Sequence, residues 1–77
     1  MDIKITIGQR IRALRETKNM AQKDLAYAAD LDRTYIASVE CGKRNISIVN
    51  IEKIANALGV SLNEFFDDVS FTQIKEL

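Results

Sequence analysis

Residues that begin and end helices recur at short intervals along this chain, and they limit its fold more than any other feature. Four side chains can cap a helix start: Thr6, Asp32, Ser47 and Ser61. The first and last of these open capping boxes, in which Gln9 and Glu64 can return a hydrogen bond. A chain of 77 residues buries only a small core. We therefore predict an all-α fold, a compact five-helix bundle.

The caps and the apolar spacing together predict the helix boundaries. The first helix is expected over residues 7–18, with Asn19 suited to a left-handed exit. The second and third are expected over 22–29 and 33–41, and the third ends at Gly42. The fourth runs from Ser47 to Gly59, and a short fifth helix follows Ser61. The fourth helix carries a broad apolar arc formed by Ile48, Ile51, Ile54, Ala55 and Leu58.

The two ends of the chain allow more than one interpretation. Ile3, Ile5 and Ile7 alternate like a strand, and Val69 and Phe71 do so weakly. These segments could pair with each other or across a dimer, or they could be frayed ends that dock apolar side chains. The folded domain is therefore placed at residues 7–66. A short C-terminal tail over residues 67–77 could take part in a dimer interface.

Missing and rare residue types exclude several classes of function. The chain has no histidine, so Cys/His zinc sites and Ser–His or Cys–His catalysis are excluded. A single cysteine cannot form an intramolecular disulfide, which fits a reducing, cytoplasmic location. No apolar run approaches the roughly 20 residues of a membrane span. We expect no enzyme, no metal, no cofactor and no membrane partner.

The distribution of charge is more informative than the net charge of zero. Residues 1–45 hold nine Lys or Arg against six Asp or Glu, a balance of +3, whereas residues 61–77 have a balance of −3. A basic front and an acidic tail indicate a polarised surface that could meet nucleic acid. The alternative is that these charges only solvate a small protein.

The second and third predicted helices, separated by a turn of about three residues, have the layout of a helix-turn-helix. At about 100° per residue, Ile36 and Val39 fall on one side of the third helix, with Tyr35 at its edge. The other side carries Arg33, Thr34, Ala37 and Ser38. This face has no Leu or Phe for a protein partner and no Glu–Lys ladder.

The chemistry of that face suits the major groove of DNA. Arg33 can offer a bidentate fork to guanine, Thr34 can bond a base edge, and the Ala37 methyl can meet a thymine methyl. Gln22 begins the second helix, where a base or phosphate contact is available. The expected DNA-binding residues are Gln22, Arg33, Thr34, Tyr35, Ala37, Ser38, Lys43, Arg44 and Asn45. The alternative is a solvated helix followed by a basic loop.

A resemblance to the Cro/repressor-type (XRE-like) helix-turn-helix family runs through QKDLAYAADLDRTYIASVECGKRNISIVNIEKIANALGVSLNEFF. It is carried by Gln-x-x-Leu-Ala, Glu-x-Gly-Lys and Ala-x-x-Leu-Gly-Val-Ser, and it covers roughly residues 7–66. Within the family, the strings at residues 32–36 (DRTYI) and 42–47 (GKRNIS) are most similar to controller proteins of restriction–modification systems.

The resemblance implies a function and several roles. Such controller proteins are small dimers that bind palindromic operators in double-stranded DNA and activate or repress transcription of their own gene and the endonuclease gene. The expected partners are therefore DNA, a second copy of the chain and RNA polymerase. The resemblance also implies an ion pair of Arg15 with Glu40 that ties the first helix to the third.

The sequence departs from the family pattern at a few positions. Ala21 stands where a Ser or Thr cap is usual, and Asp30 replaces the turn glycine. Ala37 and Cys41 replace a common Ser and a basic residue, so we expect weaker or differently specific DNA binding. Cys41, close to Lys43 and Arg44, could sense oxidants, or it is a small inert residue.

A dimer is expected because one helix-turn-helix reads half a palindrome, with recognition helices about 34 Å apart. The candidate interface comprises Val60, Leu62, Phe66, Val69 and Phe71. The alternative is that these side chains complete the monomer core. A rival function is another XRE-like regulator, or an antitoxin whose tail FTQIKEL binds a protein partner.

Overall fold

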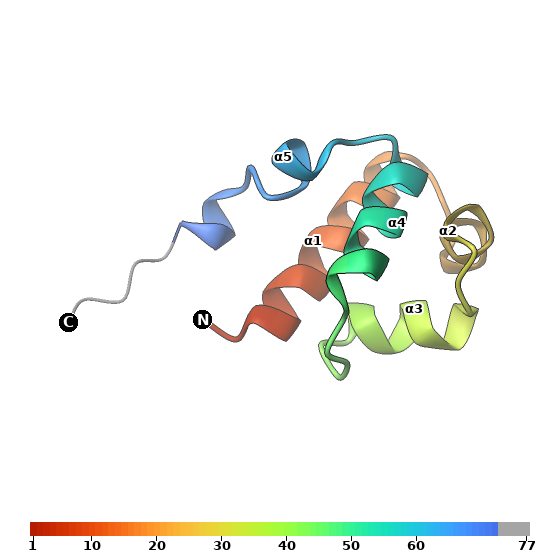
Figure 1. Ribbon diagram of the computed structural model, residues 1–77, viewed down its shortest axis with the longest axis horizontal. Helices are drawn as coiled ribbons and strands as arrows, with labels where there is room; N and C mark the ends of the chain where they lie inside the picture. Colours follow the sequence, from red (N-terminus) through yellow and green to blue (C-terminus); the bar gives the residue numbers. More distant parts are fainter. Residues whose placement is uncertain (73–77) are drawn as a thin grey trace.

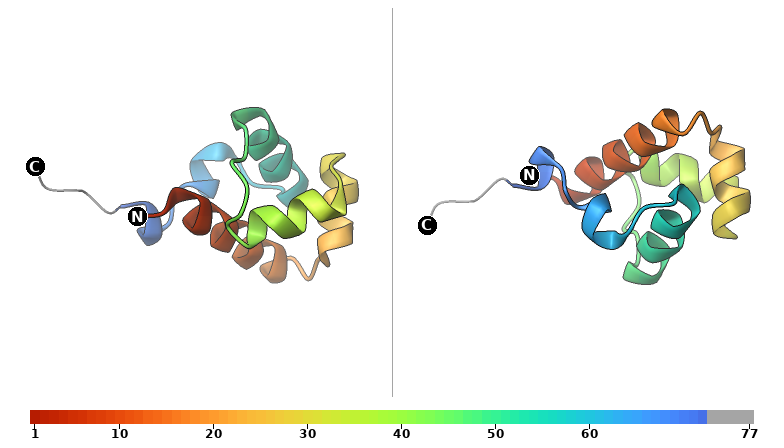
Figure 2. Two further views of the ribbon diagram at one scale, coloured as in Figure 1. Left: turned by 90° about the horizontal axis from the view of Figure 1, so that it is seen from below. Right: turned by 90° about the horizontal axis from the view of Figure 1, so that it is seen from above.

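The computed structural model describes residues 1–72, and this part of the chain is all helical. The elements are α1 (Ile3–Thr17), α2 (Gln22–Ala29), α3 (Arg33–Glu40), α4 (Ile48–Leu58), α5 (Leu62–Phe65) and a 3-10 turn, η1 (Val69–Phe71). In Figure 1, α3 runs along the lower edge, whereas α5 lies at the top and η1, in darker blue, lies to the left. Figure 2 shows α3 nearest the viewer from below and α5 nearest from above. The predicted five-helix all-α fold is confirmed.

The first helix begins one turn earlier than predicted. Asp2 caps it by accepting a hydrogen bond from the Lys4 backbone N–H at 3.1 Å, so Thr6 lies inside the helix. The Thr6 hydroxyl donates to the Asp2 carbonyl at 3.0 Å instead of capping a helix of its own. The prediction of a start at Ile7 was wrong. Two cap signals lay close together, and the earlier one adds a turn that packs on the rest of the fold.

Neither end forms a strand within residues 1–72. The alternating isoleucines at 3, 5 and 7 belong to α1, and Val69 and Phe71 belong to η1. In α1 only Ile7 of the three is buried. Ile5 falls on a different side of the helix, whereas Ile3 shares the side of Ile7 but stands at the first position of α1 and is 49% exposed. The strand interpretation of the ends was therefore wrong.

The remaining helix boundaries follow their local caps. Asp32, Ser47 and Ser61 each accept a hydrogen bond from a backbone N–H in the first turn of the helix that follows. The last of these is a full capping box, since Glu64 also accepts from the Ser61 N–H at 3.2 Å. Asn19 and Asp30 both adopt the left-handed conformation at helix ends, with φ of 57° and 56°. The cap-based predictions for α2 to α5 are confirmed to within one residue.

The core lies where the faces of all five α-helices meet. Its largest fully buried side chains are Ile11, Leu25, Ile36, Val39, Ile54 and Phe65. Ile48 is an exception to the predicted arc of α4, because its side chain is 81% exposed. It points in the same direction as Ile51 but stands at the first position of the helix, where no neighbouring element covers it. Helix periodicity gives the direction of a side chain, not the presence of a neighbour.

Arg10 fixes the C-terminal segment against α1. Its Nε donates to the Phe65 carbonyl at 2.7 Å and its Nη2 to the Glu64 carbonyl at 2.8 Å. Its Nη1 lies 3.5 Å from the carboxylate of Asp68. Hydrogen bonds from the hydroxyl and then the backbone N–H of Ser70 lower the pKa of Asp68, and Arg10 adds to this effect. Residues 67–72 are thereby held on the domain, while residues 73–77 of the predicted tail lie outside the described residues.

The predicted interface side chains divide into two groups. Val60 and Phe71 are partly buried and pack against the core. Leu62 and Phe66 are each 40% exposed, and Val69 is 81% exposed. Phe66 packs edge-on against Phe71, with ring centroids 5.1 Å apart. The described structure therefore uses part of this set in the monomer and leaves an apolar surface formed by Leu62, Phe66 and Val69.

Candidate nucleic-acid interface

The outer face of α3 is solvent-exposed, and the helix that carries it is held in a fixed position. The carboxylate of Asp32 accepts a hydrogen bond from the Thr34 backbone N–H at 2.7 Å, which fixes the first turn. On the inner side of the helix, the side chains of Ile36 and Val39 are completely buried in the core. Arg33 and Thr34 are exposed, so their donors can meet another molecule.

A buried ion pair anchors the far end of α3 to α1. Arg15 Nε donates to Glu40 Oε2 at 2.7 Å, and Nη2 donates to Oε1 at 3.0 Å. Arg15 Nη1 also donates to the Met20 carbonyl at 2.7 Å. The hydrogen bonds to Glu40 raise the pKa of Arg15, against the opposing effect of burial. With both partners about nine-tenths buried, the pair fixes the angle between α1 and α3.

Gln22 joins this network instead of standing free at the start of α2. Its Nε2 donates to Glu40 Oε1 at 3.1 Å, and its side chain is half-buried. The amide therefore has a fixed orientation, with its carbonyl oxygen unused by that bond. The Ala21 cap is compensated in part, because the Asp24 carboxylate accepts from the Ala21 N–H at 2.9 Å.

Two glycines allow α1 to approach the end of α3 closely. A Cβ on Gly8 would lie 2.4 Å from the Val39 carbonyl oxygen, so a larger residue cannot fit without moving the backbone. Gly42 has a φ of +73°, and a Cβ there would meet Ile5 at 2.7 Å. The loop that follows α3 is thus pressed against the first turns of α1.

Tyr35 and Arg44 form a stacked pair at the edge of the same face. The Arg44 guanidinium carbon lies 5.1 Å from the centroid of the Tyr35 ring, a cation–π geometry. The Tyr35 hydroxyl accepts a hydrogen bond from Asn50 Nδ2 at 3.0 Å. The ring is half-buried, so it supports an exposed guanidinium on a fixed base.

The structure brings the nine predicted DNA-binding residues to one region, with different exposures. The exposed members are Arg33, Thr34, Lys43, Arg44 and Asn45, and the half-buried members are Gln22, Tyr35, Ala37 and Ser38. Among the half-buried ones, the Ser38 hydroxyl donates to the Tyr35 carbonyl at 2.9 Å. Cys41 is exposed at the end of α3. Residues 1–72 contain no cluster of ligand side chains that could hold a metal and no helix able to span a membrane.

Comparisons with known proteins identify the family. A helix-turn-helix family model matches residues 11–65. The control protein C.MunI from Mycoplasma sp. is 49% identical over 69 residues, which are 88% of this chain and 93% of that protein. The chain belongs to the helix-turn-helix family of restriction–modification controller proteins. This confirms the family resemblance that the motifs carry.

Solved structures of this family share the fold of the chain. The controller protein C.AhdI from Aeromonas hydrophila superposes with a TM-score of 0.81 at 44% identity, covering 86% of this chain and 100% of that one. The controller protein C.Esp1396I, solved as a tetramer in complex with its natural 35 base-pair operator, gives a TM-score of 0.80 at 41% identity. That match covers 83% of this chain and 84% of the other.

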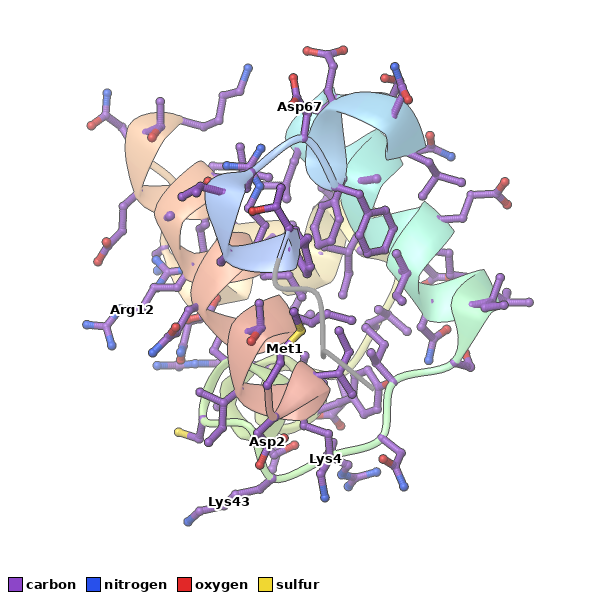
Figure 3. All side chains as sticks on the ribbon, turned by 90° about the vertical axis from the view of Figure 1, so that its left-hand side faces the viewer. Met1, Asp2, Lys4, Arg12, Lys43 and Asp67 are labelled. Atoms are coloured by element: carbon purple, nitrogen blue, oxygen red, sulfur yellow. The ribbon has the colours of Figure 1, made fainter. Side chains whose placement is uncertain are left out.

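The structure adds two residues that the sequence did not single out in this controller-protein fold. Lys4 lies on the first turn of α1 and lines a small apolar groove together with Ile7, Asn45 and Ile46. Figure 3 shows Lys4 and Lys43 projecting on the same side of the molecule. The second is Asn50, through its bond to Tyr35. A helix start at Asp2 would have revealed Lys4, but no pattern within one helix could have revealed Asn50.

Proposed function

We propose that this chain is the controller protein of a restriction–modification system and binds a palindromic operator as a homodimer, with α3 in the major groove. The observation that carries the proposal is the exposed, cap-fixed face of α3, continuous with the basic loop at residues 43–45. Its family membership and the operator complex of its relative C.Esp1396I support the same function.

Base reading is assigned to the first turns of α3. Arg33 presents five N–H donors in a fork that matches O6 and N7 of guanine. Thr34 can bond a base edge or a phosphate, and Ala37 offers a methyl group to thymine. Because the Asp32 cap and the buried side of α3 hold the backbone, these groups reach DNA without reordering the helix.

Phosphate contacts are assigned to the surroundings of α3. Lys43, Arg44 and Asn45 extend the face beyond the end of the helix, and Lys4 adds a cation from α1. Such contacts set the position and register of the protein on the duplex, while base contacts set the sequence. Each phosphate contact also makes affinity fall with salt, by roughly 0.9 decades per decade of salt.

Dimerisation is assigned to the apolar surface formed by Leu62, Phe66 and Val69. This surface lies towards a different side of the molecule from α3, so association through it leaves the recognition helix free (Figure 1). A substitution of Val69 by Lys tests it, because the side chain is 81% exposed and contributes little to the monomer. We expect Val69→Lys to sediment as a folded monomer at micromolar concentration, where the wild type is a dimer. A wild-type monomer would refute this assignment.

Selection of bound duplexes from a random DNA pool tests the function directly. We expect a palindromic consensus for the wild type, and loss of that preference in Arg33→Ala with an unchanged fold. Arg12→Ala is the matched control, because Arg12 is exposed on α1 and, among residues 1–72, forms an ion pair with Glu16 alone (Figure 3). Failure of the wild type to enrich any sequence would reject the proposed function. Wild-type affinity in Arg33→Ala would reject the assigned reading face.

Occupancy of the operator then regulates transcription by mass action. A bound dimer represses when it blocks RNA polymerase and activates when it contacts the enzyme beside its site. Because the dimer must assemble before it reads both half-sites, operator occupancy rises steeply with protein concentration.

A further inference from the structure

A residue on α4, outside the helix-turn-helix, holds part of the DNA-facing surface in place. Asn50 Nδ2 donates to the Tyr35 hydroxyl at 3.0 Å, and the ring of Tyr35 supports the Arg44 guanidinium at 5.1 Å. All three line one groove beside the start of α3, together with Leu31, Asp32 and Thr34. The three-residue chain Asn50–Tyr35–Arg44 therefore connects α4 to the predicted reading face.

Asn50 is itself rigidly placed. Its backbone N–H donates to the Ser47 hydroxyl at 3.1 Å, the capping bond of α4. The next residue, Ile51, is buried in the core and fixes the first turns of the helix. The Asn50 carboxamide is therefore attached to a fixed backbone, and it bonds to the hydroxyl of Tyr35, whose ring is half-buried. Arg44, by contrast, lies on a loop and is exposed, so its position depends on the ring beneath it.

The direction of the Asn50 bond determines what Tyr35 can offer. An amide nitrogen can only donate, so the Tyr35 oxygen accepts and its own proton remains available. That proton suits a phosphate oxygen or an acceptor on a base edge. The stacked guanidinium of Arg44 likewise keeps its N–H groups for acceptors, since cation–π contact uses its face. Both groups therefore present donors to the same groove.

We infer that Asn50 is a positioning residue for DNA recognition, which acts through Tyr35 to set where Arg44 meets the operator. The inference rests on the proposed function and adds a determinant of operator selectivity from α4. It predicts that loss of the Asn50 amide lowers selectivity, because the amide is hydrogen-bonded to the Tyr35 hydroxyl of α3.

The contact can be tested without DNA. The chain has two tyrosines and no tryptophan, so Tyr27→Phe leaves Tyr35 as the sole fluorophore. Tyr27 is 90% exposed, so we expect its replacement to leave the fold unchanged. In that background, Asn50→Ala is expected to change the tyrosine emission, because emission depends on the bonding of the hydroxyl. Asn56→Ala, the same substitution at an exposed site on the same helix, is expected to leave it unchanged. Equal emission in both variants would overturn the inference.

The effect on recognition is measured by a double-mutant cycle in the full chain. The readout is the ratio of affinities for the selected duplex and for unrelated DNA. A hydrogen bond of this kind corresponds to a change of about 2- to 10-fold. We expect Asn50→Ala and Tyr35→Phe each to lower the ratio by such a factor, and the double variant to fall no further than Tyr35→Phe alone. Asn50→Asp should also lower it, because a carboxylate can only accept, so the Tyr35 hydroxyl would donate to it and lose the proton it offers to DNA.

The outcomes separate this inference from the proposed function. A wild type that selects no sequence overturns both. A wild type that selects a palindrome, with an unchanged ratio in Asn50→Ala, overturns only the role of Asn50. Effects of the two substitutions that multiply in the double variant would show that Asn50 does not act through Tyr35. A lower melting temperature with an unchanged ratio would make Asn50 a residue of stability alone.

Discussion

Replacing Glu40 by Ala should be among the most destabilising single changes in this chain. The substitution removes the carboxylate from a buried guanidinium, leaving Arg15 with the Met20 carbonyl as its remaining partner among residues 1–72. It also removes the acceptor of the Gln22 amide. Loss of one partner from a buried ion pair costs about 3–5 kcal/mol. A chain of this size has a total stability of only about 4–12 kcal/mol.

Urea unfolding followed by circular dichroism measures this loss. With a slope of about 1 kcal/mol per molar urea, the midpoint should fall by about 3–5 M, so that Glu40→Ala is close to unfolded in buffer. The hydrogen bond to Glu40 raises the pKa of Arg15 above its ordinary value, which already lies far above neutral pH. Stability from a raised pKa is lost only as pH rises through that value, so the penalty should be constant between about pH 6 and 9.

Glu16→Ala is the matched control, because it breaks a second Arg–Glu pair of the same chain. Arg12 and Glu16 lie 3.4 Å apart with more than half of each side chain exposed, whereas the Arg15–Glu40 side chains are 11% and 3% exposed. An exposed pair contributes about 0–1 kcal/mol. If the two variants had equal midpoints, the burial argument would be refuted.

A double replacement distinguishes an uncompensated charge from a lost contact. Arg15→Met with Glu40→Leu removes the whole ion pair and fills its volume with apolar groups. Replacement of a buried pair in this way is often neutral, so the double variant should be more stable than Glu40→Ala alone, although it lacks more hydrogen bonds. A double variant no more stable than the single one would show that the geometry of the pair, not the stranded charge, sets the cost.

Three further changes have defined outcomes. Gly8→Ala should lower the melting temperature even though Ala favours helix by about 1 kcal/mol, because the new Cβ would lie 2.4 Å from the Val39 carbonyl; a higher melting temperature would contradict the close approach. The lowered pKa of Asp68 means that its stabilising effect is present above the ordinary value of 3.8 and lost as pH falls through the lowered one. The Ser70 amide shift in nuclear magnetic resonance should therefore change below about pH 4 in the wild type and show no such step in Asp68→Asn. Lys43→Ala should weaken binding to all DNA sequences alike and reduce the slope of log affinity against log salt by about 1, whereas an unchanged slope would remove Lys43 from the phosphate contacts.

Helix boundaries were predictable wherever one cap signal stood alone. Ser47, Ser61 and Asp32 each act within four residues, so the local sequence contains the whole interaction. At the N-terminus two signals competed, and packing of Ile5 against Gly42 favours the longer helix. That contact joins residues far apart in sequence, so no cap rule could weigh it. The exposure of Ile48 has the same origin, since it depends on which element lies beyond the end of α4.

In the candidate site, too, the features within one helix were predictable, and the bonds between helices were not. The periodicity of α3 separates the buried Ile36 from the exposed Thr34, because the two positions lie about 200° apart on one helix. The side-chain bonds that fix the site join different helices: Gln22 reaches Glu40 across 18 residues, and Asn50 reaches Tyr35 across 15. Sequence chemistry identified Gln22 as a donor, but the fold determines that its donor is used internally.

Because α3 is held from three sides, its presentation to DNA is a property of the whole bundle. Gly8 and Arg15 fix it to α1, Gln22 to α2, and Asn50 to α4. Transfer of residues 33–38 into a related controller protein should therefore carry the base contacts of Arg33 and Thr34. It should not carry the placement of Arg44 unless residue 50 is transferred as well. A graft of residues 33–38 alone that reproduced the complete operator preference would show that the supporting helices contribute nothing to selectivity.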